Sequence, residues 1–274
     1  MRIDELIDNV MNTAMKDNDK TREAKICPVC GKPTEKYRDL TNIKGWFPTF
    51  CDCQKQAWEE EQRKIKMLRK QQRIDNLLKI SMKAPLYDNV RFENTETGKY
   101  ESFDKAFGRC KKYCEIADKV LEANQGIYIY GEKGCGKTHI TYCMMWELIN
   151  KLYSCVMTSI SEIKRLEFSN SQDVIDDMIN CDFLFIDDLG VEVVTKNDQD
   201  NWTQEEIYKI LNARYNSKKP IIFSSNYSIS QLGTERGFKQ MTLDRINQMS
   251  TAIIKIEGVP SYRKEKVKQE KALF

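Results

Sequence analysis

Histidine is nearly missing from this sequence: one residue of the 274, His139, is a histidine. This scarcity excludes histidine-rich metal sites and argues against a Ser-His-Asp triad as the catalytic machinery. Long apolar runs are missing too, and none approaches the roughly 20 residues that a membrane-spanning helix needs. The N-terminus carries acidic residues at once and has no apolar core of a secretory signal. We therefore expect a cytoplasmic protein that does not associate with a membrane.

The sequence also lacks an excess of charge of one sign. It has 44 Lys and Arg against 41 Asp and Glu, which leaves a formal net charge of +3. A histone-like or polybasic protein is excluded, so any contact with nucleic acid must come from a local patch rather than from bulk charge.

Cysteine, in contrast, is plentiful, with ten residues. In a reducing cytosol these are expected to be thiols or metal ligands rather than disulfides. Cys27 and Cys30 form a Cys-x2-Cys-Gly turn, and Cys51 and Cys53 follow after 20 intervening residues. Four thiolates close a tetrahedral zinc site with no open position, so the pattern predicts a structural Zn²⁺ that supplies folding energy to a small loop-rich unit. The Cys-x-Cys spacing of the second pair is less specific, and buried thiols or a redox pair are the alternatives.

The length predicts more than one module. Residues 1–16 place apolar side chains at helical spacing, and residues 55–80 form a charged stretch without Gly or Pro. We expect an N-terminal helix plus zinc module over 1–54, a helical linker over 55–89 and a larger domain over 90–274.

That larger domain alternates short apolar runs with helical stretches. The runs cover 127–130, 155–158, 183–186, 221–223 and 252–256, and helices are expected near 102–123, 138–152, 161–168, 171–179 and 203–217. Most runs are apolar on both faces, as a buried parallel sheet requires. The predicted fold class is α/β: a P-loop parallel sheet flanked by helices, preceded by a small helical and zinc-binding domain.

Residues 131–138 read GEKGCGKT and match the phosphate-loop pattern G-x-x-x-x-G-K-[ST] between a predicted strand and a predicted helix. Glycines let backbone N–H groups point at phosphate oxygens, and the helix N-terminus adds its positive dipole end. Lys137 is expected to neutralise the β- and γ-phosphates of ATP, and the Thr138 hydroxyl is expected to bind Mg²⁺. The candidate nucleotide-binding residues are Gly131, Gly134, Cys135, Gly136, Lys137, Thr138 and His139, although a packing or orienting role suits His139 better than that of a ligand.

Two further strands end in polar residues. Asp187 and Asp188 follow the run 183–186, fifty residues after Lys137, at the sheet edge where ligands of open α/β sheets bind. Asp187 is expected to hold Mg²⁺, and Asp188 is expected to polarise the attacking water. Asn226 follows the run 221–223 and is a candidate for orienting that water or sensing the γ-phosphate. Its alternative role is to cap the helix that starts near Ser228.

These motifs resemble a known family. GEKGCGKTH, FLFIDDLG, EEIYKILNARYNSKKPIIFSSNYS, and LDRI followed by SYR are similar to the DnaC/DnaI-type helicase loaders of bacteria and phages. This branch of the AAA+ ATPases also contains the IstB-like transposition ATPases. The resemblance covers roughly residues 90–263 and implies a bacterial or phage-infected bacterial cell. The aspartate at position 188 departs from the glutamate usual among AAA+ enzymes, and it suits slow turnover.

The resemblance also implies an arginine that reaches the γ-phosphate of a neighbouring subunit. Arg245 is the best match, with Arg236 and Arg214 as lesser candidates. Such a guanidinium makes hydrolysis depend on self-association through the ATPase domain. The alternative is a surface ion pair between Asp244 and Arg245, of little consequence.

A loader is expected to bind a hexameric replicative DNA helicase and to help place it on single-stranded DNA, with ATP binding and slow hydrolysis as a switch. The N-terminal zinc module, which DnaI-like loaders also carry, favours this over an IstB-like helper of a DNA transposase. An adaptor with ATP as a structural ligand and a P-loop kinase are weaker alternatives. Basic residues considered for DNA contact are Lys164, Arg165, Lys218 and Lys219.

Overall fold

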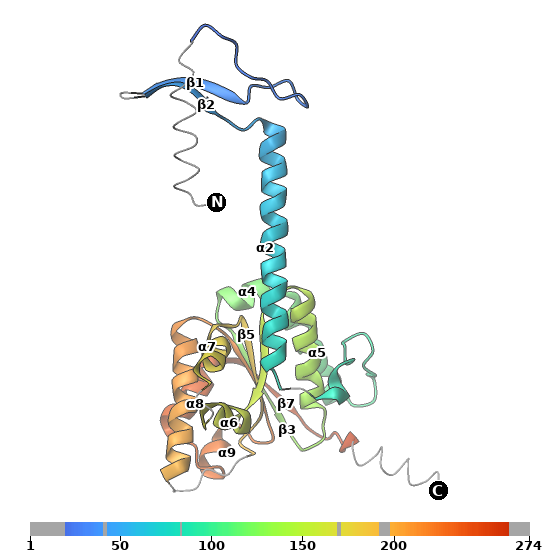
Figure 1. Ribbon diagram of the computed structural model, residues 1–274. Helices are drawn as coiled ribbons and strands as arrows, with labels where there is room; N and C mark the ends of the chain where they lie inside the picture. The colour runs from blue at the N-terminus through green and yellow to red at the C-terminus, as the bar shows by residue number, and fades with distance from the viewer. Residues whose placement is uncertain (1–19, 41–42, 83, 169–170, 192–197, 263–274) are drawn as a thin grey trace. The chain divides into compact units, whose positions relative to one another are not determined.

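The computed structural model describes residues 20–40, 43–82, 84–168, 171–191 and 198–262. The predicted helix over residues 1–16 lies outside these ranges. The chain divides into two compact units, Met1–Arg69 and Lys70–Phe274, and the division falls within the long helix α2 (Asp52–Ile80) (Figure 1). Among the helices of the described ranges, none combines the length and the apolar character needed to cross a membrane.

The first unit contains an antiparallel hairpin that the sequence analysis did not anticipate. Strands β1 (Glu35–Leu40) and β2 (Ile43–Pro48) pair over six positions, and the rings of Tyr37 and Trp46 meet edge to face at 5.7 Å between centroids. Charged residues interrupt both strands, which hides the period-2 pattern that announces a half-buried strand. The hairpin fills the interval between the two cysteine pairs.

The second unit is built on a sheet of five parallel strands, as predicted. They are β3 (Gly126–Gly131), β4 (Cys155–Ser159), β5 (Phe183–Leu189), β6 (Ile221–Ser225) and β7 (Ser250–Ile256). Their order across the sheet is β4-β5-β6-β3-β7, and each neighbouring pair is parallel. The strand that precedes the phosphate loop is therefore flanked by β6 and β7.

Helices cover both faces of this sheet (Figure 1). They are α3 (Glu101–Glu115), α4 (Ala117–Glu122), α5 (Lys137–Asn150), α6 (Ile160–Phe168), α7 (Gln172–Asn180), α8 (Asp198–Asn216), α9 (Ile229–Thr234) and α10 (Gln240–Met249), with a short 3-10 turn η1 (Pro85–Tyr87) before them. Alternate residues of one strand join opposite cores: Phe183 packs with α3 and α5, whereas Leu184 packs with α7 and α8. Both faces of the strands are buried, which explains their continuous apolar runs.

Two local features differ from the sequence prediction. The single helix expected over 102–123 is broken at Ile116, whose backbone leaves the helical region at φ −103° and ψ 28°, so that α3 and α4 are separate. Helix α10 was not predicted, although Leu243 and Ile246 have the spacing of a buried helical face.

The edge strand β4 is covered by the chain that leaves α2. The backbone N–H of Met82 donates to the carbonyl of Met157 at 2.7 Å, and the N–H of Met157 donates to the Ser81 hydroxyl at 3.2 Å. Ile74 and Leu77 of α2 are each 1% exposed and belong to the two cores of this unit. The last turns of α2 are thus packed into the core of the second unit.

Candidate functional site

The phosphate loop connects β3 to α5. Gly134 and Gly136 have φ of 92° and 98°, a region that side chains rarely adopt. A Cβ on Gly136 would lie 2.6 Å from Phe103 of α3, and one on Gly134 would lie 2.2 Å from Ser261. The loop is therefore tightly enclosed by the segments beside it. Its glycines are required by backbone conformation and by space.

Lys137, the first residue of α5, is 4% exposed. Its Nζ donates to the carbonyls of Gly131 and Glu132 and to Oδ1 of Asn226, each at 2.9 Å. The buried ammonium is thus positioned by the loop itself and by the end of β6. This is the location that a P-loop lysine needs to neutralise phosphate oxygens.

Asp187 stands at the end of β5 and faces the first turn of α5. The Thr138 hydroxyl donates to its two carboxylate oxygens at 3.2 and 3.0 Å, and the Ser224 hydroxyl donates to Oδ1. Burial raises the pKa of Asp187, the charge of Asp188 adds to this, and the hydrogen bonds and Lys137 oppose it. A buried carboxylate beside a threonine hydroxyl fits the hard oxygen ligands that Mg²⁺ prefers.

Asp188 has an unusual backbone. Its φ is 52°, and the pairing of β5 with β6 shifts register between Ile186 and Leu189. The irregularity leaves Asp188 exposed, while its N–H donates to the Ser224 hydroxyl at 3.0 Å. A non-glycine residue in this region is strained, and such strain concentrates at functional sites. The turn separates the two acids: one faces Thr138, and the other faces outward.

Asn226 lies beside Lys137, as the 2.9 Å contact shows, because β6 and β3 are neighbours in the sheet. The alternative role as a helix cap is wrong. Ser228 is the N-cap of α9, where its hydroxyl accepts from the N–H of Gln231 and the Gln231 side chain accepts from the N–H of Ser228. The part of Asn226 in sensing phosphate or orienting water stays a prediction.

Two loop neighbours are enclosed by protein. His139 contacts the Thr95 hydroxyl through Nε2 at 2.8 Å, and burial lowers its pKa. Cys135 is 2% exposed, and burial raises the pKa of its thiol. The contact with Thr95 favours an orienting role for His139.

The three candidate arginines have different surroundings. Arg214 is fully buried and donates to backbone carbonyls, which removes it as a residue that reaches another subunit. Arg236 donates to the carbonyls of Gly190 and Val191, just after the paired acids. Arg245 is half-buried on α10.

Within its own chain, Arg245 contacts α8 and its own helix. Its guanidinium donates to Asn212 at 2.9 Å and to Gln248 at 3.0 Å, and it lies 4.0 Å from the centroid of the Tyr215 ring. The suggested pair with Asp244 is not formed among the described residues, where Asp244 accepts from Gln240 instead. The action of Arg245 on a neighbour stays a prediction.

The four N-terminal cysteines come together. Their sulfur atoms lie within 4.8 Å of one another, and Cys53 is 3.5, 3.2 and 3.5 Å from Cys27, Cys51 and Cys30. Four sulfurs about 2.3 Å from a tetrahedral zinc lie about 3.8 Å apart, so the cluster fits this metal.

The electrostatics of the cluster point the same way. Backbone N–H groups of Cys30 and Val29 lower the pKa of Cys27 to about 6, whereas contact with the neighbouring sulfurs, Cys51 first, raises the pKa of Cys53 to about 12. Crowded thiols cannot all ionise without a cation to neutralise them, and a divalent metal supplies that charge. The turn that aims the first pair is built by Gly31, with φ 68°, whose N–H donates to the Cys27 carbonyl at 2.9 Å.

Sequence reasoning missed some residues of the site. Ser224 contacts Asp187 through its side chain, and its hydroxyl accepts from the backbone of Asp188; its signal was the polar end of an apolar run. Phe103 and Ser261 enclose the loop glycines from distant parts of the chain. No pattern in the sequence reports such a long-range approach.

Fold and site together define an AAA+ P-loop NTPase: a parallel sheet with a phosphate loop after β3, an acidic pair after β5 and a polar residue after β6. A family model described as "Novel STAND NTPase 3" matches residues 110–272. The chain belongs to this family of NTPases.

Comparison with individual proteins supports the helicase-loader resemblance. The chain is 28% identical over 169 residues to the phage-like element PBSX protein XkdC of Bacillus subtilis, covering 59% of this chain and 63% of that protein. It therefore spans less than two thirds of that relative. It is 26% identical over 250 residues to the replicative helicase loader DnaC of Escherichia coli, covering 88% of this chain and 93% of DnaC.

A solved structure confirms the fold. The crystal structure of DnaI superposes with a TM-score of 0.53 at 21% identity, covering 66% of this chain and 94% of that chain. At this identity the likeness is one of fold alone. The predicted resemblance to DnaC/DnaI-type loaders is confirmed by these matches.

Proposed function

We propose that the chain is an ATP-dependent loader that binds a hexameric replicative DNA helicase and helps place it on single-stranded DNA during replication initiation. The observation that carries the proposal is the joint placement of Lys137 against Asn226 and of Thr138 against Asp187. This arrangement occurs on a chain that aligns with nearly the full length of a protein named as a helicase loader.

The chemistry follows from the positions of these side chains. Lys137 neutralises the β- and γ-phosphates, and Thr138 with Asp187 holds Mg²⁺, which supplies charge neutralisation to the transferring phosphoryl group. Asp188 faces outward and polarises the attacking water. Its side chain is shorter than glutamate and reaches less far, so hydrolysis to ADP and phosphate is slow and suits a switch.

The N-terminal part has a separate role in this proposal. The module over 1–54 holds a structural Zn²⁺ through Cys27, Cys30, Cys51 and Cys53, and it contacts the helicase. The linker over 55–89 joins it to the ATPase domain over 90–274, which binds ATP and self-associates. Exposed apolar side chains of the module support a partner-binding role: Ile26, Val29 and Phe50 are 65%, 82% and 70% exposed.

The test is co-purification of the full chain with the replicative helicase of its source. We expect the wild type to form a complex with the helicase. In a second experiment, binding of a fluorescent ATP analogue should be lost in Lys137→Ala. Lys133→Ala is the matched control, because Lys133 lies exposed in the same loop. Retained nucleotide affinity in Lys137→Ala would contradict the site, and capture of a transposase without helicase would favour the IstB-like function.

A further inference from the structure

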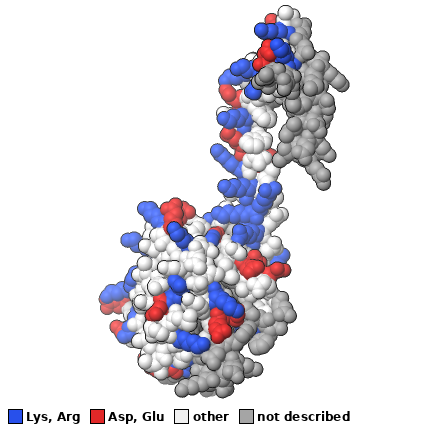
Figure 2. Space-filling view, turned by 90° about the vertical axis from the view of Figure 1, so that its left-hand side faces the viewer, with Lys and Arg blue, Asp and Glu red and all other residues white. Residues whose placement is uncertain are grey.

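The middle of α2 carries charge of one sign. From Gln62 to Ile74 the sequence contains no acidic residue. The basic residues in this stretch are Arg63, Lys64, Lys66, Arg69, Lys70 and Arg73, and all six are exposed. Figure 2 shows Lys and Arg side chains gathered along this helix. The near-neutral net charge of the whole chain conceals this local excess.

Three of these cations contact a described partner, and three do not. Lys64 pairs with Glu60 at 3.2 Å, Lys70 lies over the Tyr153 ring, and Arg73 donates to the Asn180 carbonyl. Arg63, Lys66 and Arg69 make no ion pair or hydrogen bond with any residue that the structure describes. We refer to these three residues as the basic stripe.

Helix geometry places the basic stripe on one face. Spacings of three residues advance about 300° each, so the three side chains fall within an arc of about 120° and within about 9 Å along the axis. Like charges three or four residues apart destabilise a helix by about 0.2–0.5 kcal/mol per pair. A face that accumulates this repulsion without compensation fits a polyanionic ligand.

An exposed aromatic residue lies beside the basic stripe. Trp58 is 55% exposed, and its ring makes no aromatic or cation–π contact with another described residue. Around the axis it is offset from Arg69 by about 20° and from Arg63 by about 140°, and along the axis it lies about 7.5 Å before Arg63, so the stripe and Trp58 together span an arc of about 140°. Exposed aromatic rings next to cations are typical of surfaces on which unpaired bases stack.

We propose that the basic stripe and Trp58 form a contact site for single-stranded DNA. Arg63, Lys66 and Arg69 neutralise successive phosphates, and Trp58 stacks on an unpaired base. The indole favours a single strand, since the bases of a duplex are already stacked inside it. The proposal rests on the DNA-binding part of the proposed function and gives it a location on α2.

The test is fluorescence anisotropy of a labelled oligo-dT strand titrated with the full chain at several salt concentrations. The triple variant R63Q/K66Q/R69Q should bind at least about 10-fold more weakly at low salt. Its slope of log K against log salt should fall by about 2, because each single-strand phosphate contact contributes about 0.7. Trp58→Ala should weaken binding by about 5- to 150-fold, as expected for one stacked base.

The control removes three lysines that already have acidic partners: Lys55, Lys64 and Lys105, which contact Glu59, Glu60 and Glu101. The variant K55Q/K64Q/K105Q has the same net charge as the stripe variant and should keep most of the affinity. An equal loss in both variants, or an unchanged salt slope in the stripe variant, would overturn the proposal. Circular dichroism of each variant verifies that α2 remains helical.

Two further measurements separate the possible outcomes. Trp58→Ala should leave binding of a blunt duplex unchanged, and an equal loss on duplex would refute base stacking. If the stripe variant keeps DNA affinity but loses the helicase, then α2 binds protein and the inference is wrong while the proposed function stands. If the wild type binds no oligo-dT at all, the inference and the DNA-binding part of the proposed function both fail.

Discussion

At the scale of single residues, Asp187 carries opposing demands. Its carboxylate is 5% exposed and adjoins a second acid, which raises its pKa, while Thr138 and Ser224 donate hydrogen bonds to it. An ionised buried carboxylate is unfavourable for the folded protein without a cation, yet ionisation is what a metal ligand requires. Ionisation of Asp187 therefore reduces the stability of the folded protein, and in the proposed function it serves the binding of Mg²⁺.

The effect of this ionisation on folding stability can be measured as a function of pH. Because the folded pKa of Asp187 is raised, the folded state binds the proton more tightly than the unfolded state, and stability falls as pH rises above about 4 toward the raised pKa. Asp187→Asn removes this titration. Without nucleotide or Mg²⁺, the melting temperature of the variant minus that of the wild type should therefore increase from pH 4 to pH 7. Each 1 kcal/mol of stability that the wild type loses over this range should add on the order of 2–4 °C to the difference.

Asp173→Asn is the control for this experiment, since Asp173 is exposed on α7. This variant removes an exposed carboxylate and supplies the pH dependence with which that of Asp187→Asn is compared. A constant deficit of Asp187→Asn at every pH would mean that the carboxylate contributes only its hydrogen bonds.

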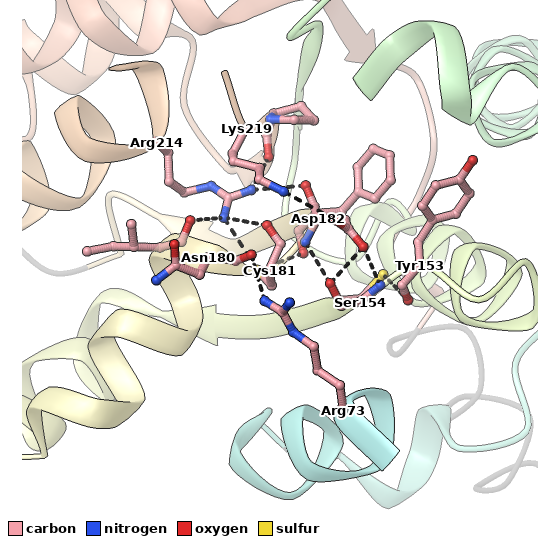
Figure 3. Close-up of polar contacts among 12 residues, drawn as sticks. Arg73, Tyr153, Ser154, Asn180, Cys181, Asp182, Arg214 and Lys219 are labelled. Carbon is pink, nitrogen blue, oxygen red and sulfur yellow. Dashed lines mark hydrogen bonds and ion pairs between the residues drawn. The ribbon is translucent and has the colours of Figure 1, made fainter. Parts of the chain in front are cut away.

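At the scale of elements, Arg214 joins three segments. Its guanidinium donates to the carbonyls of Met178 and Cys181 at 2.7 and 3.0 Å and to that of Pro220 at 2.7 Å, which connects the end of α7 to the starts of β5 and β6. Figure 3 shows the Arg214 guanidinium beside Cys181 and Asp182. Asp182, beside it, accepts from Ser154 and pairs with Lys219 at 3.2 Å. A guanidinium reaches these carbonyls from two terminal nitrogens in a fixed planar fork, whereas a lysine ammonium presents its three donors from a single nitrogen.

Arg214→Lys should therefore destabilise the protein by about 3 kcal/mol, since hydrogen bonds to charged groups contribute about 1.5–3 kcal/mol each. Urea unfolding measures the change. Arg109→Lys, an exposed arginine on α3, should stay within about 0.5 kcal/mol of the wild type. Equal stability of the two variants would show that the buried fork contributes nothing to holding α7, β5 and β6 together.

The cluster of four cysteines gives a prediction about metal content. Freshly purified protein should contain about one zinc per chain, and Cys30→Ser should lose most of it, because a serine hydroxyl does not replace a thiolate. Elemental analysis supplies the measurement. Cys135→Ser removes a cysteine outside the cluster and should leave the zinc content unchanged; metal-free wild type would refute the site.

The elements also show how far sequence reasoning extends. The five strands and the phosphate loop were predictable because burial on both faces leaves continuous apolar runs, and because the loop needs glycines at fixed positions. The β1–β2 hairpin was not predicted, because its strands carry charged side chains between apolar ones. The break between α3 and α4 at Ile116 was not predicted either, because Phe107, Cys110 and Cys114 keep a helical spacing right up to it.

The site divides in the same way. Lys137, Thr138 and Asp187 belong to motifs with fixed spacing, and they do meet. The enclosure of Gly136 by Phe103 depends on how α3 packs, which only the folded chain determines. The burial of Arg214 could not be predicted from the sequence either, because an arginine on a helix is ordinarily exposed to solvent.

At the scale of the whole molecule, hydrolysis is expected to depend on assembly. Arg245→Ala should lower ATP turnover on the order of 10²-fold or more, as loss of an arginine supplied by a neighbour does. Asp188→Asn should be inactive for a different reason, because its own water is not polarised. Mixing the two variants should restore part of the activity, since an Arg245→Ala subunit receives the missing guanidinium from an Asp188→Asn neighbour.

Turnover of the mixture against each variant alone is the measurement. No recovery on mixing, together with a lower melting temperature of Arg245→Ala, would instead assign Arg245 to packing against Tyr215 and Asn212 of its own chain. Wild-type turnover per subunit should rise with protein concentration.

The hydrogen bonds of the Ser81 hydroxyl and the Met82 N–H with the backbone of Met157 have a practical meaning for anyone who truncates this protein. They occupy the N–H and the carbonyl of Met157 at the middle of β4, an edge strand that otherwise invites strand addition by a second molecule. A recombinant fragment that begins downstream of Met82 exposes this edge and deletes Ile74 and Leu77 from the interior. Such a fragment is expected to aggregate, whereas a fragment that starts at or before Lys70 keeps the edge strand covered and should stay in solution.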